Sequence, residues 1–125
     1  MGARNLKQQI SHFVPDLVEI VGFGTGAATD ALTALNAPGV TSVDQTGTGL
    51  YTVLLEDKWN RLMHFSFEVL DAGTPDDWDV RVVTETVSTT KTLTLAVFKG
   101  GTLTDLTTDE KLYMRILVSN SERNR

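Results

Sequence analysis

The chain has 125 residues, of which 41% are hydrophobic and 22% are charged, a balance typical of one globular domain rather than of a disordered chain. It contains no cysteine, which excludes disulfides, thiolate nucleophiles and cysteine-based zinc or iron–sulfur sites. Its formal net charge of -5 argues against nucleic acid or an anionic membrane surface as a partner, because both favour a basic face.

Residues 1–14 form a polar N-terminal segment whose charged residues are Arg4 and Lys7. We expect a flexible N-terminal arm, because chain ends are rarely ordered unless they are tied down. The alternative is an arm that lies along a neighbouring subunit, with Ile10 and Phe13 as its apolar anchors. The segment lacks the apolar core of a signal peptide, and no apolar run in the chain approaches the roughly 18–20 residues that span a bilayer.

The first predicted element is a strand over residues 16–22, with Pro15 just before it. A glycine-rich loop is predicted over residues 22–28. The next stretch, residues 31–35, is compatible with either a short helical turn or another strand. Residues 36–39, with the sequence Asn-Ala-Pro-Gly, indicate a turn.

The glycine-rich stretch also matches a nucleotide-binding pattern. Gly22, Gly24 and Ala27 fit the G-x-G-x-x-A turn that brings backbone close to a pyrophosphate, and Asp44 lies where a ribose-binding acid would stand. That fold needs further βαβ units, however, and nothing after Gly39 shows a helical period of adequate length. A dinucleotide-binding enzyme is therefore a remote alternative to an apolar strand with a loop.

The pattern of residues 39–56 predicts two strands joined by a Gly-Thr-Gly turn at residues 47–49. Threonine, valine, tyrosine and leucine suit a pleated, half-buried surface, and glycine can adopt the positive φ of a tight hairpin. Tyr51, Val53 and Leu55 fall on one face at period 2. We expect this hairpin to be the template around which the rest of the sheet is built.

The same alternation continues in four later segments, over residues 62–71, 78–87, 91–99 and 111–118. The side chains predicted to share an inward face within each segment are Met63, Phe65, Phe67, Val69, Trp78, Val80, Val82, Leu93, Leu95, Val97, Leu112, Met114, Ile116 and Val118. About seven or eight strands with frequent turn signals predict an antiparallel β-sandwich or a jelly-roll-like barrel over residues 15–119. Residues 120–125 are predicted to form a polar C-terminal tail.

The candidates for catalysis are few. His12 and His64 are the only histidines. His64 lies opposite the Phe65 and Phe67 face of its strand, which favours an exposed or cross-strand position, and no Ser-His-Asp grouping can be argued from the sequence. We therefore expect no catalytic residue, cofactor or metal ligand, and no enzymatic activity.

An acidic cluster and two tryptophans are the remaining candidates for a binding site. Carboxylates gather over residues 71–79, but their spacing matches no EF-hand, so a solvated acidic loop is favoured over a calcium site. Trp59 and Trp78 are favoured as lids at the ends of the sandwich rather than as platforms on which a sugar stacks.

The hairpin resembles a segment that recurs in small structural proteins of tailed bacteriophages. The residues that carry the resemblance are Gly-Val-Thr-Ser-Val at 39–43 and Thr-Gly-Thr-Gly-Leu-Tyr-Thr-Val at 46–53, followed by the strand at 91–95 and the Ile-Leu-Val-Ser-Asn-Ser stretch at 116–121. Asp44 departs from the pattern, which has arginine or another polar residue there. The resemblance implies a head decoration (cement) protein.

Such a protein would be a virion component on the outer capsid surface, made in the host cytoplasm. The resemblance implies the major capsid protein as its partner and a homo-oligomer, with a trimer favoured. The alternative is a tail or fibre accessory module that binds a partner or a glycan, the latter through Trp59 or Trp78. The candidate interaction residues are Arg4, Lys7, Ile10, Phe13 and Trp59.

Overall fold

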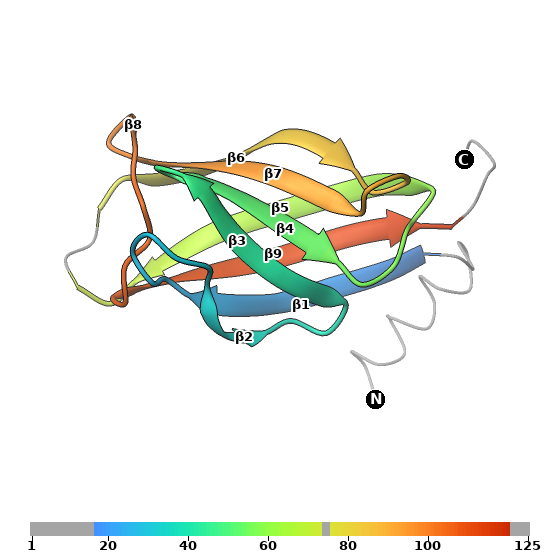
Figure 1. The fold of residues 1–125 in the computed structure, drawn as a ribbon, viewed down its shortest axis with the longest axis horizontal. Helices are drawn as coiled ribbons and strands as arrows, with labels where there is room; N and C mark the ends of the chain where they lie inside the picture. Colours follow the sequence, from blue (N-terminus) through green and yellow to red (C-terminus); the bar gives the residue numbers. More distant parts are fainter. Residues whose placement is uncertain (1–16, 74–75, 121–125) are drawn as a thin grey trace, which may run out of the picture.

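A computed structural model describes residues 17–73 and 76–120, which form nine strands in two antiparallel sheets (Figure 1). The strands are β1 (Leu17–Thr25), β2 (Thr33–Asn36), β3 (Val40–Gly47), β4 (Leu50–Leu55), β5 (Arg61–Asp71), β6 (Trp78–Thr86), β7 (Thr92–Lys99), β8 (Thr102–Leu103) and β9 (Glu110–Ser119). The first sheet has the order β2-β1-β9-β5, and the second has the order β3-β4-β7-β6, with β8 added beside β7. The predicted antiparallel sandwich is confirmed, whereas the predicted arm lies outside the described residues.

The central hairpin forms as predicted. β3 and β4 pair antiparallel, with Val43 opposite Val53, and the turn between them uses a positive φ of 69° at Gly49. Tyr51, Val53 and Leu55 are fully buried, so the predicted inward face is confirmed. β4 then pairs with β7, which makes the hairpin one half of the second sheet.

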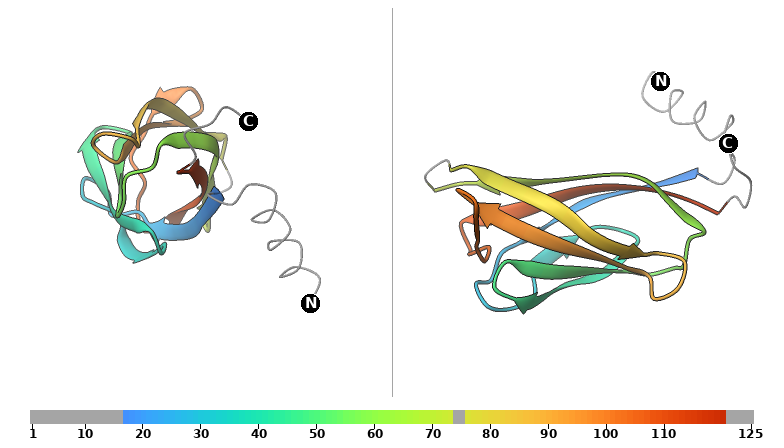
Figure 2. Two further views of the ribbon diagram at one scale, coloured as in Figure 1. Left: turned by 90° about the vertical axis from the view of Figure 1, so that its right-hand side faces the viewer. Right: turned by 90° about the horizontal axis from the view of Figure 1, so that it is seen from above.

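The core lies between the two sheets. Its largest contributions from β7 and β9 are the alternating side chains that the sequence predicts, all of them buried: Leu93, Leu95, Val97, Leu112, Met114, Ile116 and Val118. On one side the sheets meet next to β2 and β3, where the N–H of Leu32, the residue before β2, donates to the carbonyl of Val43 in β3 at 2.9 Å. On the other side β5 and β6 run next to each other (Figure 2), with no ladder joining them among the described residues.

β1 is longer than predicted, and the loop expected over residues 22–28 is wrong for its first half. The strand continues through Gly22 and Gly24 to Thr25, which pairs with Lys111 of β9. A Cβ on Gly22 would lie 2.3 Å from the Cα of Ala37, so glycine is needed where the chain leaving β2 crosses β1. Gly22 of the nucleotide-binding pattern therefore serves the approach of two backbone segments, whereas a Cβ on Gly24 would lie 3.1 Å from the side chains of Leu32 and Leu35.

β5 departs from strict alternation. A bulge between Leu62 and His64 places Met63 at the surface with 44% exposure, although the sequence predicts it inside. Phe65 lies opposite Ile116 on the core side but is 41% exposed, because β5 is an edge strand that pairs, within the described part of the chain, with β9 alone. Phe67 is buried, as predicted.

Tyr51 joins the hairpin to the loop that precedes β9. Its hydroxyl accepts a hydrogen bond of 2.8 Å from the N–H of Leu106, and both residues are fully buried. Burial raises the pKa of the Tyr51 hydroxyl above 10.0, with smaller contributions in the same direction from Asp105 and Glu110 and an opposing one from the hydrogen bond.

We expect Tyr51→Phe to lower the free energy of unfolding by about 1–3 kcal/mol at neutral pH, because it leaves the buried N–H of Leu106 without an acceptor. The Tyr51 contribution is fully present below the pKa of the unfolded chain and is lost as pH rises through the higher folded pKa. The difference in stability between the two proteins should therefore shrink above about pH 10. Urea titrations at neutral and alkaline pH measure it; a difference that grows with pH would contradict the assignment.

Candidate functional site

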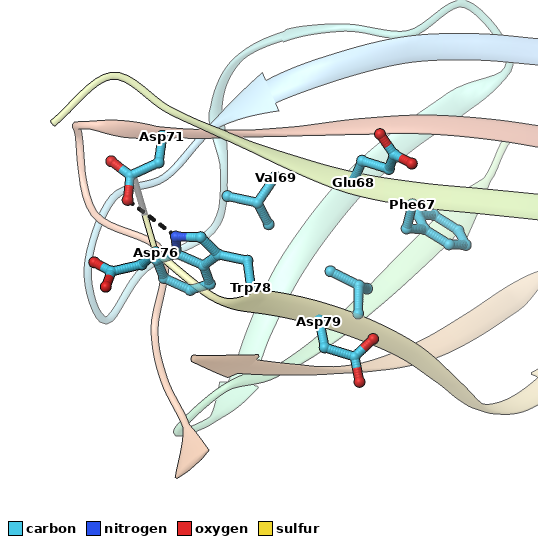
Figure 3. A pocket seen from close by; sticks show the side chains of 8 residues that line it. Phe67, Glu68, Val69, Asp71, Asp76, Trp78 and Asp79 are labelled. Atoms are coloured by element: carbon cyan, nitrogen blue, oxygen red, sulfur yellow. Dashed lines mark hydrogen bonds between the residues drawn. The ribbon is translucent and has the colours of Figure 1, made fainter. Parts of the chain in front are cut away.

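The described residues enclose a pocket of about 390 Å³ at the end of the seam between β5 and β6 (Figure 3). Phe67, Val69 and Val80 supply apolar atoms to the lining. Four carboxylates surround them, from Glu68, Asp71, Asp76 and Asp79. The pocket is therefore an acidic slot with an apolar floor, formed by the edges of both sheets.

Hydrogen bonds fix the loop end of the pocket. The indole N–H of Trp78 donates to Oδ2 of Asp71 at 3.0 Å, and the N–H of Gly73 donates to Oδ1 of the same carboxylate at 2.9 Å. These contacts hold the Asp71 carboxylate beside the Trp78 ring, across the gap between the two sheets. The first sheet and the second sheet are thereby joined at this end.

Two cations balance part of the negative charge. Lys99 Nζ lies 3.1 Å from Asp76 and 5.5 Å from the centre of the Trp78 ring, and Arg81 Nε lies 2.8 Å from Asp79. The hydrogen bond and the charge of Asp76 raise the pKa of Lys99 above its ordinary value of 10.5. Among the described residues no cation pairs with Glu68 or Asp71, which leaves the pocket with net negative charge.

The polar side chains of the pocket lining are four carboxylates and the indole of Trp78. Its described lining contains no serine, threonine, cysteine, histidine or lysine. Within residues 17–73 and 76–120, no group of three or more histidine, cysteine, aspartate or glutamate side chains is placed to hold a metal ion. A cationic group would complement the charge of this lining.

A second candidate surface is the solvent side of the first sheet. We define this outer face by its exposed or half-buried apolar side chains, which are Val21, Phe23, Leu70, Tyr113 and Leu117. They come from β1, β5 and β9, the three strands that pair side by side in this sheet. Val21 is 52% exposed. A surface of this kind on a rigid sheet is typical of a protein-binding site.

Contacts among neighbouring side chains order the outer face. The rings of Phe23 and Tyr113 stack with their centres 5.1 Å apart, and Lys111 Nζ lies 5.6 Å from the centre of the Phe23 ring. Arg115 forms an ion pair of 2.6 Å with Glu19 across β9 and β1. These side chains lose little freedom when a partner covers them, which lowers the entropic cost of binding.

The sequence-predicted interaction residues are only partly placed. Arg4, Lys7, Ile10 and Phe13 lie outside the described residues. Trp59 packs against the core and is half-buried, and its Nε1 is buried with no hydrogen-bond partner among the described residues. The ring of Trp59 is therefore covered in large part by its own protein.

The sequence analysis did not predict any residue of the outer face as an interaction residue. Phe23 falls in the predicted loop, and Tyr113 occupies an outward position of a strand considered for its inward side chains. The available signal is the presence of apolar side chains at outward positions, such as Val21 and Tyr113, where polar residues are the norm on a solvated sheet. His64, by contrast, is exposed as expected and stacks on Phe65.

Comparison of the chain with protein-family models, with curated proteins and with solved structures gives no match. None of the described residues belongs to a helix with the length and apolar character needed to cross a membrane.

Proposed function

We propose that the protein is a decoration (cement) protein of a tailed bacteriophage head, which binds the outer surface of the capsid and stabilises it. The observation that carries the proposal is the outer face of the first sheet, an ordered set of apolar and aromatic side chains exposed on a sandwich. The phage-like sequence of the β3–β4 hairpin supplies the class of partner. In this proposal the partner is the major capsid protein.

Burial of these side chains provides the binding energy. Covering exposed apolar surface contributes roughly 25 cal/mol per Å², and aromatic side chains such as Tyr113 are frequent anchors of interfaces. The charged side chains interspersed among the apolar ones of the outer face, Glu19, Lys111 and Arg115, set the orientation of the partner. A trimer would add avidity, because binding of one subunit raises the effective concentration of the next.

The direct test uses emptied capsids of the phage that encodes the protein. We expect the purified protein to bind them and to raise the temperature at which they break open. Calorimetry of capsids with and without the protein measures this shift, and sedimentation with the capsids measures binding. An unchanged opening temperature together with no co-sedimentation would disprove the proposal.

Substitutions on the outer face should separate binding from folding. We expect Val21→Asp and Tyr113→Asp each to weaken capsid binding by about tenfold or more, because each places a charge inside the proposed interface. The matched control is Val83→Asp, since Val83 is 57% exposed but belongs to β6 in the other sheet. Equal capsid affinity for the Val21 and Val83 variants would exclude the outer face as the binding surface.

A second candidate, a tail or fibre module that binds a glycan, rests on one further observation. Trp78 and Phe98 line a cavity of about 430 Å³ together with Asp77, Asp79 and Arg81. Aromatic rings beside carboxylates are common in sugar sites, but here Arg81 lies 5.3 Å from the centre of the Phe98 ring and Lys99 lies against Trp78. A glycan panel tests this candidate: binding that Trp78→Ala abolishes would support it over the capsid role.

A further inference from the structure

We propose that two copies of the chain pair through the free edges of their β5 strands, antiparallel and centred on Phe67. This inference is independent of the capsid role, because it uses an edge of the first sheet and leaves the outer face uncovered. Within residues 17–73 and 76–120, β5 pairs along one side only, with β9, although it is eleven residues long. A long free edge presents backbone N–H and C=O groups that a second strand can pair with.

Backbone hydrogen bonds identify the residues that face this edge. The N–H of Ala72, just after β5, donates to the carbonyl of Asp109 on the β9 side at 2.9 Å. The carbonyl of Glu110, opposite Asp71, instead accepts from Gly26 on the β1 side at 2.9 Å. In an antiparallel ladder, alternate residues direct their N–H and C=O groups to opposite sides of the strand. The β5 residues whose groups face the free edge are therefore Phe65, Phe67, Val69 and Asp71.

The side chains of these residues leave room beside β5 for a partner strand. Phe65 is on the core side but is 41% exposed, and Val69 is half-buried and lines the pocket of about 390 Å³. The bulge between Leu62 and His64 interrupts regular pairing at the start of β5, so residues 65–71 form the usable part of the edge. A strand added here would cover apolar surface, and every copy of the chain carries the same strand.

A two-fold axis at Phe67 gives the apolar residues of this edge apolar partners. Phe67 lies opposite the partner's Phe67, and Phe65 lies opposite the partner's Val69. Because Val69 contributes to the apolar floor of the pocket, each Phe65 ring packs over the pocket of the other copy. The three facing pairs, 65 with 69, 67 with 67 and 69 with 65, exchange about six backbone hydrogen bonds.

Charge favours this register over its neighbours. With the axis at Phe67, the two Asp71 carboxylates are eight positions apart along the strand pair, about 27 Å. An axis at Val69 brings them to about 13 Å and places Phe67 opposite Asp71, and an axis at Asp71 puts the two carboxylates in contact. The two Glu68 carboxylates are two positions apart with the axis at either Phe67 or Val69. With the axis at Phe67, however, each faces the partner's Ser66, whose hydroxyl can donate to it.

The pairing has a defined outcome for the assembly. Two four-stranded sheets become one eight-stranded sheet, with both outer faces on the same side. An isologous contact of this kind closes with two copies, so it gives a dimer in place of the trimer that the sequence resemblance implies.

The mass of the protein in solution tests the number of copies. We expect sedimentation equilibrium over a micromolar concentration series to give a dimer of 27.4 kDa (2 × 13.7 kDa). A monomer at every concentration, or a trimer, would overturn the proposal.

Cross-linking tests the register, because the chain has no cysteine and an introduced one is unique. A mixture of Ser66→Cys and Glu68→Cys proteins should form a disulfide-linked dimer on mild oxidation, since opposite Cβ atoms lie about 4.5–5.5 Å apart. Glu68→Cys mixed with Leu70→Cys, the pair that an axis at Val69 would bring together, should give several-fold less. Linking in the second mixture that equals or exceeds the first, or no linking in either, would overturn the register.

A substitution on the edge tests the contact itself. Phe65→Lys should weaken the dimer by about tenfold or more, because it places an ammonium group opposite the partner's Val69. The matched control is Val83→Lys, since Val83 is 57% exposed but lies in β6 of the other sheet, and this variant should keep the affinity of the parent. Equal dimer affinity for the two variants would exclude the β5 edge. The cross-linking result does not depend on the folding of Phe65→Lys.

Discussion

Gly22→Ala is expected to lower the free energy of unfolding by at least about 3 kcal/mol. The added methyl group would lie 2.3 Å from the Cα and Cβ of Ala37 and 2.3 Å from the carbonyl oxygen of Asn36. These are backbone and near-backbone atoms, so no flexible side chain can move aside, and β1 must shift against β2. Since β1 also pairs with β9 along its whole length, the shift would disturb the centre of the first sheet.

Gly73→Ala is the matched control for this substitution. Its added methyl group would lie 3.4 Å or more from its nearest neighbours, an ordinary contact, and we expect a change within about 0.5 kcal/mol. Denaturant titrations of both variants provide the comparison. If Gly22→Ala proved as stable as the parent, the close crossing of β1 by the chain after β2 would be wrong.

The second large effect is expected at Leu106, which is fully buried although it lies between β8 and β9 rather than in a strand. Leu106→Ala should lower the free energy of unfolding by about 2–5 kcal/mol, because it leaves a cavity in the core and loosens the loop that Tyr51 holds. Thermal unfolding followed by circular dichroism measures the loss.

Leu103→Ala gives the comparison for Leu106, since the same side-chain atoms are removed three residues earlier in the chain. Leu103 is exposed, and we expect its loss to cost less than about 1 kcal/mol. Equal costs at the two positions would show that Leu106 does not anchor this loop to the core.

The strands that could be predicted from the sequence are those in which the alternation of apolar and polar residues decides whether each side chain is buried. In β4, β7 and β9, strict alternation of apolar and polar residues placed Tyr51, Leu95 and Ile116 inside, and all three are fully buried. These strands lie in the interior of their sheets, where both neighbours are strands and the pattern of burial is complete.

In β5 and β1, the alternation of apolar and polar residues did not predict the structure correctly. Met63 is exposed because a bulge adds a residue to β5, and a bulge leaves no reliable trace in the alternation of a single sequence. Gly22 and Gly24 favoured a loop prediction because glycine is rare inside strands, and only the position of Ala37 shows why glycine is needed at residue 22.

The candidate surfaces were harder to predict, because each one is assembled from separate segments. Asp71 and Trp78 are close in sequence, but their hydrogen bond depends on the two sheets being brought edge to edge. The stacking of Phe23 on Tyr113 depends on the register between β1 and β9, which are ninety residues apart (113 − 23 = 90). Composition and periodicity carry no information on such pairings.

The placement of Leu17 opposite Ser119 has a mechanical consequence. A force that pulls these two residues apart would open the β1–β9 ladder from one end, breaking its hydrogen bonds one after another instead of loading them together. Such peeling requires little force. If tension reaches this domain through the ends of β1 and β9, we expect the two strands to separate progressively from that end.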